Sequence, residues 1–349
     1  MTRSIAILLL LILFHGFVLS LSSHAEIPGE RNLGDFANDD GSHPDGTDSP
    51  RDDSSAMRRA LAAGPGIVRI GTGHYRFGDI QIPAGVSVIG AGKSTVIRPA
   101  GAANAIFQIA SVNDWELRDM VLEGESTGKW EQRKDAKKIG LSTSGCWGFE
   151  IVGVTARNFS GTGFAFSHTN LGEAAFSDGG RLERLVARGN YIGIAFDTRG
   201  EYITATHLNC RENVTGCAIH AGNTNISASN FCGNTDGMII VDKENGSHGS
   251  ISNCLFNHNT RYALWARAVE HGMAIDNCCF FYGTIFLDET TGVQITSGLV
   301  SCHVKTTGEK SNRFAGNYII PGESWTFEFS EKTIVEDNFT KEGAWQRNR

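Results

Sequence analysis

Seven charged or histidine side chains lie at equivalent places in a series of short repeats, four to six positions after a repeated glycine or the tyrosine that replaces it. They are His168, Asp197, Arg199, His220, Asp242, Lys243 and Arg267. Histidine and arginine can accept a proton, and lysine and arginine can neutralise a carboxylate. The set matches a β-elimination on a uronic acid, in which the carboxylate is neutralised, C5 is deprotonated and the leaving oxygen is protonated.

These residues divide by expected role. The expected catalytic residues are Asp197, Arg199, His220, Asp242 and Lys243, and the expected substrate-binding residues are His168 and Arg267. His220 or Arg199 would act as the base. Arg199 or Lys243 would neutralise the carboxylate, or a calcium ion held by Asp197 and Asp242 would do so. The alternative is an ordinary polar face made of charge pairs.

A tryptophan among cations lies in a long insertion at residues 125–138. Trp130 can stack on a sugar ring, and Arg133 and Lys134 can pair with its carboxylate. A second insertion, residues 167–180, follows the equivalent strand of the next coil. Because loops on a rigid scaffold commonly carry function, we expect the first insertion to bind substrate. The alternative is a solvated loop whose charges bind nothing specific.

The elements that must position these residues belong to a repeat. It reads Asn-x-x-Gly or Asn-x-x-Tyr before a short apolar strand, and it begins at Asn190, Asn213, Asn234 and Asn259. Steps of 21 to 25 residues with two or three short strands each are typical of a solenoid. Alternating apolar residues would point inward, and asparagines would stack in the turns. This predicts an all-β parallel β-helix.

The ends of the chain differ from this pattern. Residues 1–25 have a positive start, an apolar run and small residues at the end, which predicts a cleaved signal peptide; an uncleaved membrane anchor is the alternative. Residues 26–53 are polar and not periodic. The β-helix domain is expected over 54–349. Its open ends need caps, and we expect a capping helix at 54–63 and a C-terminal cap at about 320–349.

One segment resembles a known family. Its matching parts are Asn32 to Phe36, Asp45 to Asp48, Asp52 to Ser54, Ala56 to Ala63, Ile67 to Ile70 and Gly73 to Arg76. They are similar to the N-terminal module of pectate lyase and rhamnogalacturonase type found in the pectate-lyase-like superfamily, although Ala37 replaces its usual glycine and Gly71 its usual proline. The resemblance implies a right-handed, single-stranded parallel β-helix. It leaves activity open, because the superfamily contains lyases, hydrolases, epimerases and non-catalytic adhesins.

Composition excludes some partners. The formal net charge of −7 disfavours a general nucleic-acid-binding protein. The run Gly90 to Thr95 lacks the first glycine of a phosphate-binding loop, so no nucleotide is expected. Asp236 and His248 resemble pieces of the polygalacturonase signature, but the second carboxylate that such a hydrolysis needs is missing from the register.

The chain has eight cysteines. We interpret most of them as small inward-facing residues of the core. The alternative is a disulfide between Cys254 and Cys278, which occupy the same position in successive coils.

These observations predict a carbohydrate-active protein that is secreted, periplasmic or otherwise extracellular. The expected partner is an acidic, uronate-containing polysaccharide, and we favour a polysaccharide lyase or a glycosidase. The alternative is a non-catalytic glycan-binding or surface β-helix. Calcium remains open as a cofactor. A monomer is expected, with no stable membrane association once the signal peptide is cleaved.

Overall fold

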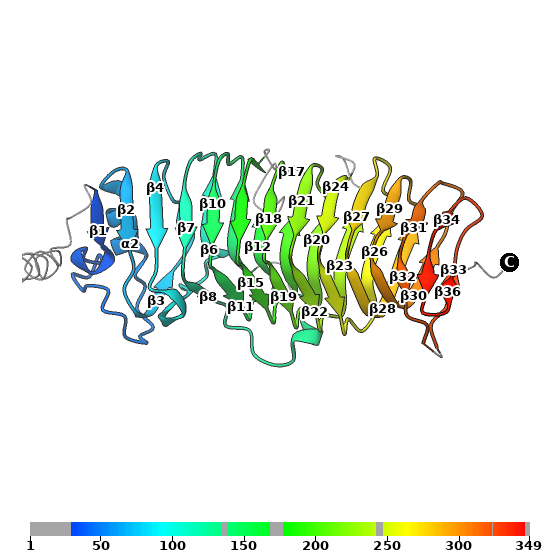
Figure 1. The fold of residues 1–349 in the computed structure, drawn as a ribbon. Coiled ribbons are helices and arrows are strands. Elements are labelled where there is room, and N and C mark those ends of the chain that lie inside the picture. The colour runs from blue at the N-terminus through cyan, green and yellow to red at the C-terminus, as the bar shows by residue number, and fades with distance from the viewer. Residues whose placement is uncertain are drawn as a thin grey trace, which may run out of the picture.

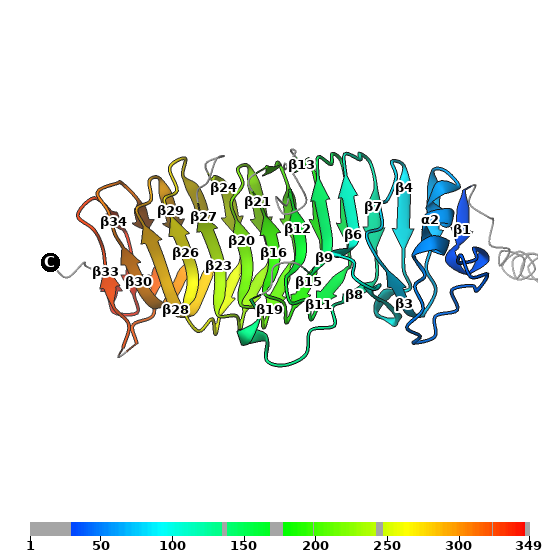
Figure 2. The same cartoon turned by 180° about the vertical axis from the view of Figure 1, so that it is seen from behind.

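The chain winds into a right-handed parallel β-helix, a long stack of coils that add rungs to three rows of strands (Figures 1 and 2). The computed structural model describes residues 29–134, 138–167, 177–197, 199–241, 247–322 and 324–345. Within these residues the rungs pair in parallel, apart from the terminal antiparallel pair β35–β36. The predicted fold class is therefore confirmed.

The first row comprises β1 (Glu30–Asn32), β2 (Gly66–Arg69), β4 (Val86–Ile89), β7 (Glu116–Arg118), β10 (Glu150–Val152), β14 (Arg181–Glu183), β18 (Thr204–Thr206), β21 (Thr224–Ser227), β24 (Gly249–Ser252), β27 (Met273–Asp276), β29 (Val293–Thr296), β31 (Arg313–Ala315) and β34 (Ile334–Glu336). The second row comprises β3 (Gly73–Phe77), β5 (Thr95–Pro99), β8 (Val121–Glu123), β11 (Thr155–Arg157), β15 (Val186–Arg188), β19 (Asn209–Arg211), β22 (Asn230–Cys232), β25 (Leu255–Asn257), β32 (Tyr318–Ile319) and β35 (Phe339–Thr340), which β36 (Gly343–Ala344) joins.

The third row comprises β6 (Ala105–Ala110), β9 (Ile139–Ser144), β12 (Thr162–Phe166), β16 (Ile192–Phe196), β20 (Thr215–Ile219), β23 (Asp236–Val241), β26 (Tyr262–Arg267) and β33 (Phe327–Glu328). The strands β28 (Cys279–Asp288) and β30 (Leu299–Thr306) run through both the second and the third rows. The short β13 (Ser177–Asp178) and β17 (Gly200–Glu201) pair with each other, and single 3-10 turns occur at Leu33–Asp35, Gly92–Ser94 and Trp130–Gln132.

The turns define two edges. We call the turns between the second and third rows the Asn edge, because the repeated asparagines lie there. Asn190, Asn213, Asn234 and Asn259 are at most 1% exposed. Each amide nitrogen in the ladder donates to the next asparagine's Oδ1, for example from Asn213 to Asn234 over 3.1 Å. The turns between the third and first rows form the far edge.

Aromatic side chains stack inside the coils. One stack joins Trp115, Phe149, Phe166 and Phe196, with ring centroids 5.2 to 5.8 Å apart. A second joins Phe231, Phe256 and Phe280. All eight cysteines are free thiols, six of them buried, so the core interpretation is confirmed and the Cys254–Cys278 disulfide is not formed. Stacked like residues in each column give the solenoid one continuous core.

The N-terminal end of the core is covered by helix α2 (Ser54–Ala62), the only α-helix in the described part of the chain. The helix buries its own residues Ala56, Met57, Ala60 and Leu61. This confirms the predicted capping helix. Strand β1, from the polar segment, adds a rung beyond β2. No helix among the described residues is long and apolar enough to cross a membrane, and the predicted signal peptide at residues 1–25 lies outside the described residues.

The observed register corrects the sequence alignment at one coil. The alignment placed Tyr262 opposite Gly237. In the structure Met238 pairs with Leu264, so Ala263 faces Gly237, because the turn after Asn259 contains one more residue. Arg267 therefore belongs to the column of Asp197 and His220, one place earlier than the alignment gave.

The asparagine ladder predicts a specific stability defect. Asn234→Ala removes the acceptor of the Asn213 backbone N–H and a donor to the Cys210 carbonyl, and leaves both groups buried. We expect a loss of roughly 2–5 kcal/mol in the free energy of unfolding, measured by urea denaturation. Asn225→Ala, at an exposed strand position, should change it by less than about 0.5 kcal/mol. Equal losses for the two variants would contradict a structural role for the ladder.

Candidate functional site

Two of the predicted catalytic residues are in contact. Asp197 follows β16 and His220 follows β20, one coil further along the far edge. His220 Nδ1 lies 3.1 Å from Asp197 Oδ1, and Asp197 is only 8% exposed. An aspartate that accepts a hydrogen bond from Nδ1–H fixes the imidazole tautomer and leaves Nε2 as the basic nitrogen. The pair can therefore serve as a general base.

The other predicted far-edge residues add little to this pair. Arg199 is half-buried two residues after Asp197, and its carbonyl accepts a hydrogen bond from the Ser177 N–H. Arg267 lies two rungs beyond His220 and faces Asp288, with a separation of 3.8 Å. His168, Asp242 and Lys243 lie outside the described residues. Among the described members of the expected catalytic set, Asp197 and His220 are therefore in contact.

The calcium hypothesis involves the same edge. The described ranges contain no group of three or more His, Cys, Asp or Glu residues placed to hold a metal ion. Asp197 is described, but its proposed partner Asp242 is not. Calcium binding by these two carboxylates therefore stays a prediction.

The predicted sugar-binding insertion lies on the Asn edge. Figure 2 shows its loop projecting below the second row, opposite the edge that carries β13. Trp130 and Arg133 line a hollow of about 450 Å³ with Arg157 and Arg188, at the rungs of β11 and β15. Lys134 is exposed and is not part of its lining. Since β16 is five residues long, the hollow and Asp197 lie at opposite ends of a strand about 17 Å long.

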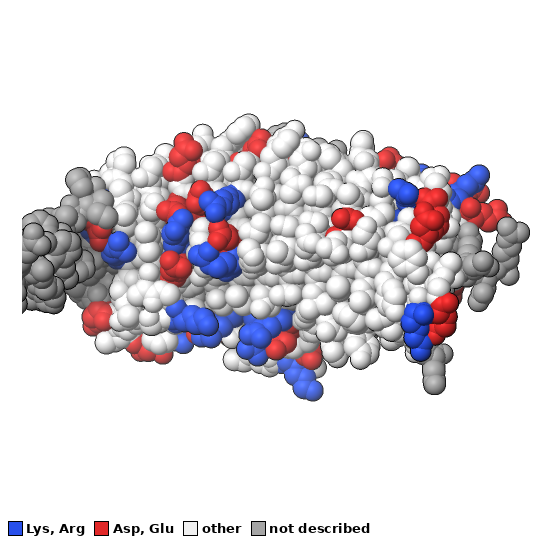
Figure 3. Space-filling model, viewed as in Figure 1, with Lys and Arg blue, Asp and Glu red and all other residues white. Residues whose placement is uncertain are grey.

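A column of arginines runs along the second row beneath this loop. Parallel pairing aligns Arg76 with Arg98, and then Glu123, Arg157, Arg188 and Arg211. Successive members are about 4.8 Å apart, as strands in a sheet are. Figure 3 shows Lys and Arg side chains along the lower margin of the molecule over this row, with Asp and Glu side chains beside them. The sequence analysis did not identify this column.

Carboxylates offset much of the charge in the column. Glu123 accepts from Arg98 and Arg157, and Arg188 pairs with Glu212 through two contacts of 2.8 and 3.1 Å. The lining of the hollow nevertheless contains four cations, Lys129, Arg133, Arg157 and Arg188, against two carboxylates, Glu131 and Glu212. We call this set with Trp130 the arginine hollow. Its excess of cations suits an anionic ligand.

Arg133 is the least compensated of these cations. Its side chain is 8% exposed, and Nη2 donates to the Ser126 carbonyl over 3.2 Å. Its Nε and Nη1 have no acceptor among the described residues, and neither does the buried Nε of Arg157. Burial lowers the pKa of the Arg133 guanidinium because desolvation disfavours its charged form. An anion bound in the hollow, such as a carboxylate or a sulfate, would lower the cost of burying this charge.

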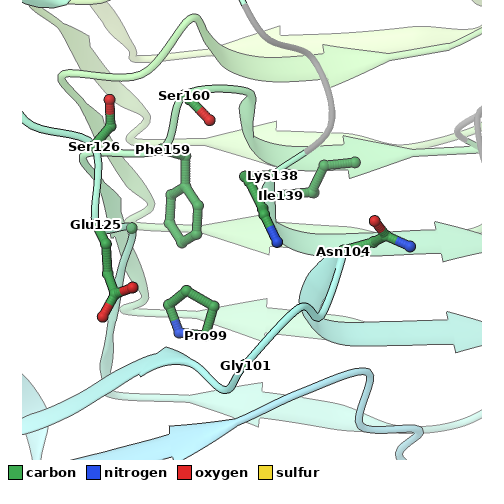
Figure 4. A pocket seen from close by; sticks show the side chains of 10 residues that line it. Pro99, Gly101, Asn104, Glu125, Ser126, Lys138, Ile139, Phe159 and Ser160 are labelled. Carbon is green, nitrogen blue, oxygen red and sulfur yellow. The ribbon is translucent and has the colours of Figure 1, made fainter. Parts of the chain in front are cut away.

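A smaller hollow of about 220 Å³ lies on the other side of the same loop (Figure 4). Phe159 and Pro99 face it, with Glu125 and Lys138 on either side. Lys138 Nζ donates to the Ala103 carbonyl over 2.6 Å. Because this lysine is already engaged, the smaller hollow offers less to an anion than the arginine hollow does.

The signal for the arginine column was present in the sequence. The third residue of the second-row strand is arginine in Thr155-Ala-Arg157, Val186-Ala-Arg188 and Asn209-Cys-Arg211. The sequence analysis aligned the coils on the glycine that follows the Asn edge and examined only positions beyond it. The arginines lie before the asparagine, so they were not among the predicted site residues.

Comparisons with known proteins identify the fold. No family model and no curated protein matches the chain. Among solved structures, a tailspike protein of E. coli bacteriophage HK620 is similar with a TM-score of 0.62 and 12% identity, over 88% of this chain and 67% of that one. The Dettilon tailspike protein is similar with a TM-score of 0.61 and 11% identity, over 90% and 68% of the two chains.

Another structure of the HK620 tailspike, in complex with a pentasaccharide, has a TM-score of 0.54 at 11% identity. ORF18 of Geobacillus virus E2 has a TM-score of 0.50 at 14% identity, over 90% of this chain, and this chain spans 60% of that protein's length. Identities this low show a shared fold and leave the activity open. The chain therefore has the right-handed parallel β-helix fold that the resemblance in its N-terminal module implies.

Proposed function

We propose that this protein binds an acidic polysaccharide at the arginine hollow on the Asn edge. One observation carries the proposal: Arg133 is buried with two N–H groups that lack acceptors, in a hollow with an excess of cations. A buried, uncompensated charge is costly, and a bound anion would relieve that cost. Half-buried Trp130 beside it offers an aromatic surface to a sugar ring.

The repeat of the fold supports a polymer as the ligand. Arg157, Arg188 and Arg211 occupy successive rungs about 4.8 Å apart. A polysaccharide with an acidic group on each sugar also presents its charges at regular intervals. A chain lying along the Asn edge can then meet several arginines in turn, while a single anionic sugar meets only the hollow.

Other findings agree with this proposal. The fold is shared with a tailspike protein that has been solved in complex with a pentasaccharide. We also propose that the protein works outside the cytoplasm, secreted or periplasmic, because residues 1–25 match a signal peptide. A monomer is part of the same proposal.

A second candidate function is cleavage of the bound polymer by a lyase or glycosidase reaction. The hydrogen bond between Asp197 and His220 favours it, because it orients an imidazole as a general base. For a uronide, a nearby cation such as Arg199 would neutralise the carboxylate and His220 would take the C5 proton. The C4–O bond would break as the C4=C5 double bond forms, and the leaving oxygen would take a proton from water. The far edge would then hold the reacting sugar, and the arginine hollow would hold another part of the polymer.

The binding proposal predicts the effect of Arg133→Met. This change keeps the volume of the side chain and removes the charge, so affinity for a polyuronate should fall by about tenfold to a hundredfold, since hydrogen bonds to charged groups contribute roughly 1.5–3 kcal/mol. Isothermal titration calorimetry with polygalacturonate, alginate and hyaluronan measures it. Arg313→Met, which alters an ion pair with Glu336 on the first row, is the matched control and should bind normally. Unchanged affinity in Arg133→Met would sink the proposal.

Arg133→Met and Arg98→Met should differ in stability. Arg133→Met removes a desolvated cation with unfilled hydrogen bonds, so the unliganded variant should be at least as stable as the wild type. Arg98→Met breaks ion pairs with Asp48 and Glu123 and should lose roughly 1–2 kcal/mol. Urea unfolding without glycan measures both. A marked loss of stability in Arg133→Met would indicate that this arginine has a structural role.

The catalytic candidate predicts that His220→Asn slows cleavage and leaves binding intact. Loss of a general base typically lowers the rate by about 10²–10⁴-fold. The assay follows the ultraviolet absorbance of unsaturated products together with new reducing ends, on the same polymers. Wild-type protein that binds a polymer and releases neither product would support the non-catalytic, glycan-binding alternative.

A further inference from the structure

An aromatic groove lies on the Asn edge, further toward the C-terminus than the arginine hollow. It has a volume of about 550 Å³ and is formed by turns that follow β25, lie within β28 and β30, and precede β33. The side chains that shape it are His258, Arg261, Tyr282, His303 and Trp325. None of the predicted catalytic or substrate-binding residues lies in this groove.

The rings of the groove meet at steep angles. Tyr282 and Trp325 have centroids 6.1 Å apart and planes inclined at 83°. His303 meets Trp325 at 85° with centroids 5.0 Å apart, and His258 packs on Tyr282 at 4.5 Å. Tyr282 remains 48% exposed. The groove therefore has two aromatic walls with polar atoms at their tips, which suits a ligand that has both apolar C–H faces and hydroxyl groups.

The backbone holds two of these aromatics in an unfavourable conformation. The residue just before the ladder position is left-handed in successive coils, with φ of +65° at Gly189, +54° at Glu212 and +66° at Gly233. Glycine adopts this conformation without steric cost. The same place is occupied by His258 at +53° and by Tyr282 at +64°, and a bulky side chain is disfavoured there.

The charge of the groove is already balanced. Asp236 is fully buried and accepts two hydrogen bonds from Arg261, Nε to Oδ1 over 2.7 Å and Nη2 to Oδ2 over 2.5 Å. The side chain of Arg261 is 56% exposed, so the fixed guanidinium still presents a donor to the groove. Arg261 is a donor whose charge is already neutralised, and it lies beside aromatic walls. Such a site suits the hydroxyl groups of a sugar better than it suits a free anion.

We propose that the aromatic groove is a second glycan subsite, in which a pyranose ring stacks on one of the two rings, Tyr282 or Trp325, and contacts the other with its edge, while a ring hydroxyl accepts a hydrogen bond from Arg261. This inference rests on the proposed function, which supplies the acidic polysaccharide as the ligand. Arg188 and Tyr282 are separated by four rungs, from β15 through β19, β22 and β25 to β28, which is about 19 Å. One chain along the Asn edge reaches both sites, while a short oligosaccharide reaches one.

The test uses oligosaccharides of graded length from the polymer that the wild type binds, together with neutral gluco-oligosaccharides. Tyr282→Gly and Trp325→Ala should each weaken binding of long oligomers by about tenfold, as expected for loss of one stacked ring. Binding of the shortest acidic oligomers, which depends on Arg133, should be unchanged. Calorimetric titration of the full-length protein measures both affinities.

The fold provides matched controls. Tyr202 is also an exposed tyrosine, 58% exposed, with a left-handed φ of +50°, and it lies at the far edge after β17. Tyr202→Gly should leave every affinity unchanged. Trp147, which is 52% exposed and lies near β13, is the corresponding control for Trp325. Tyr282→Gly relieves backbone strain, so its thermal midpoint should equal or exceed that of the wild type while its affinity falls, a combination that a purely structural tyrosine would not show.

The outcomes separate this inference from the proposed function. Normal binding of long oligomers by both groove variants, with weak binding by Arg133→Met, overturns the second subsite and keeps the first. Weak binding by the groove variants with normal binding by Arg133→Met keeps the second subsite and overturns the first. No binding of any glycan by the wild type overturns both. If Tyr282→Gly instead abolishes a dimer seen by sedimentation and leaves affinities unchanged, the groove is a contact between copies and the inference fails.

Discussion

The structure depends on parallel pairing of successive coils, held in register by buried asparagines. Each ladder amide bonds both its neighbour and a strand carbonyl, so a shift of one residue would leave several buried polar groups without partners. This constraint turns sequence positions into columns. Where the turn after Asn259 contains an extra residue, the asparagine stays in the ladder and the change is absorbed before the next strand.

Columns bring like residues together. This stabilises the apolar core, but it places side chains of like charge next to one another. Stacked phenylalanines gain from repetition, whereas stacked arginines repel one another. In the second row this repulsion is reduced by ion pairs: Glu123 lies between Arg98 and Arg157, and Glu212 lies beside Arg188. The loop above them brings in Arg133 without an acceptor for two of its donors. That local departure from compensation is the physical basis for placing an anionic ligand there.

The two edges of the helix offer different chemistry. The Asn edge carries the arginine hollow, which is rich in cations, and the aromatic groove, which is lined by exposed rings. The far edge carries the Asp197–His220 pair. Because the third-row strands between them are rigid parts of the stack, a polymer bound at one edge reaches the other only by crossing the third-row face. The proposed binding and the candidate cleavage would therefore be separable by mutation.

The sequence by itself determined the period, the asparagine ladder, the inward apolar columns and the capping helix, because these follow from local repetition and side-chain chemistry. It also indicated Trp130 and Arg133 as binding residues and placed His220 one coil from Asp197. The tertiary structure alone decided that the loop and that pair lie at opposite ends of the strands, and that arginines of separate coils form one column. The reason is that register and edge are set by hydrogen bonds between coils, which no single repeat contains.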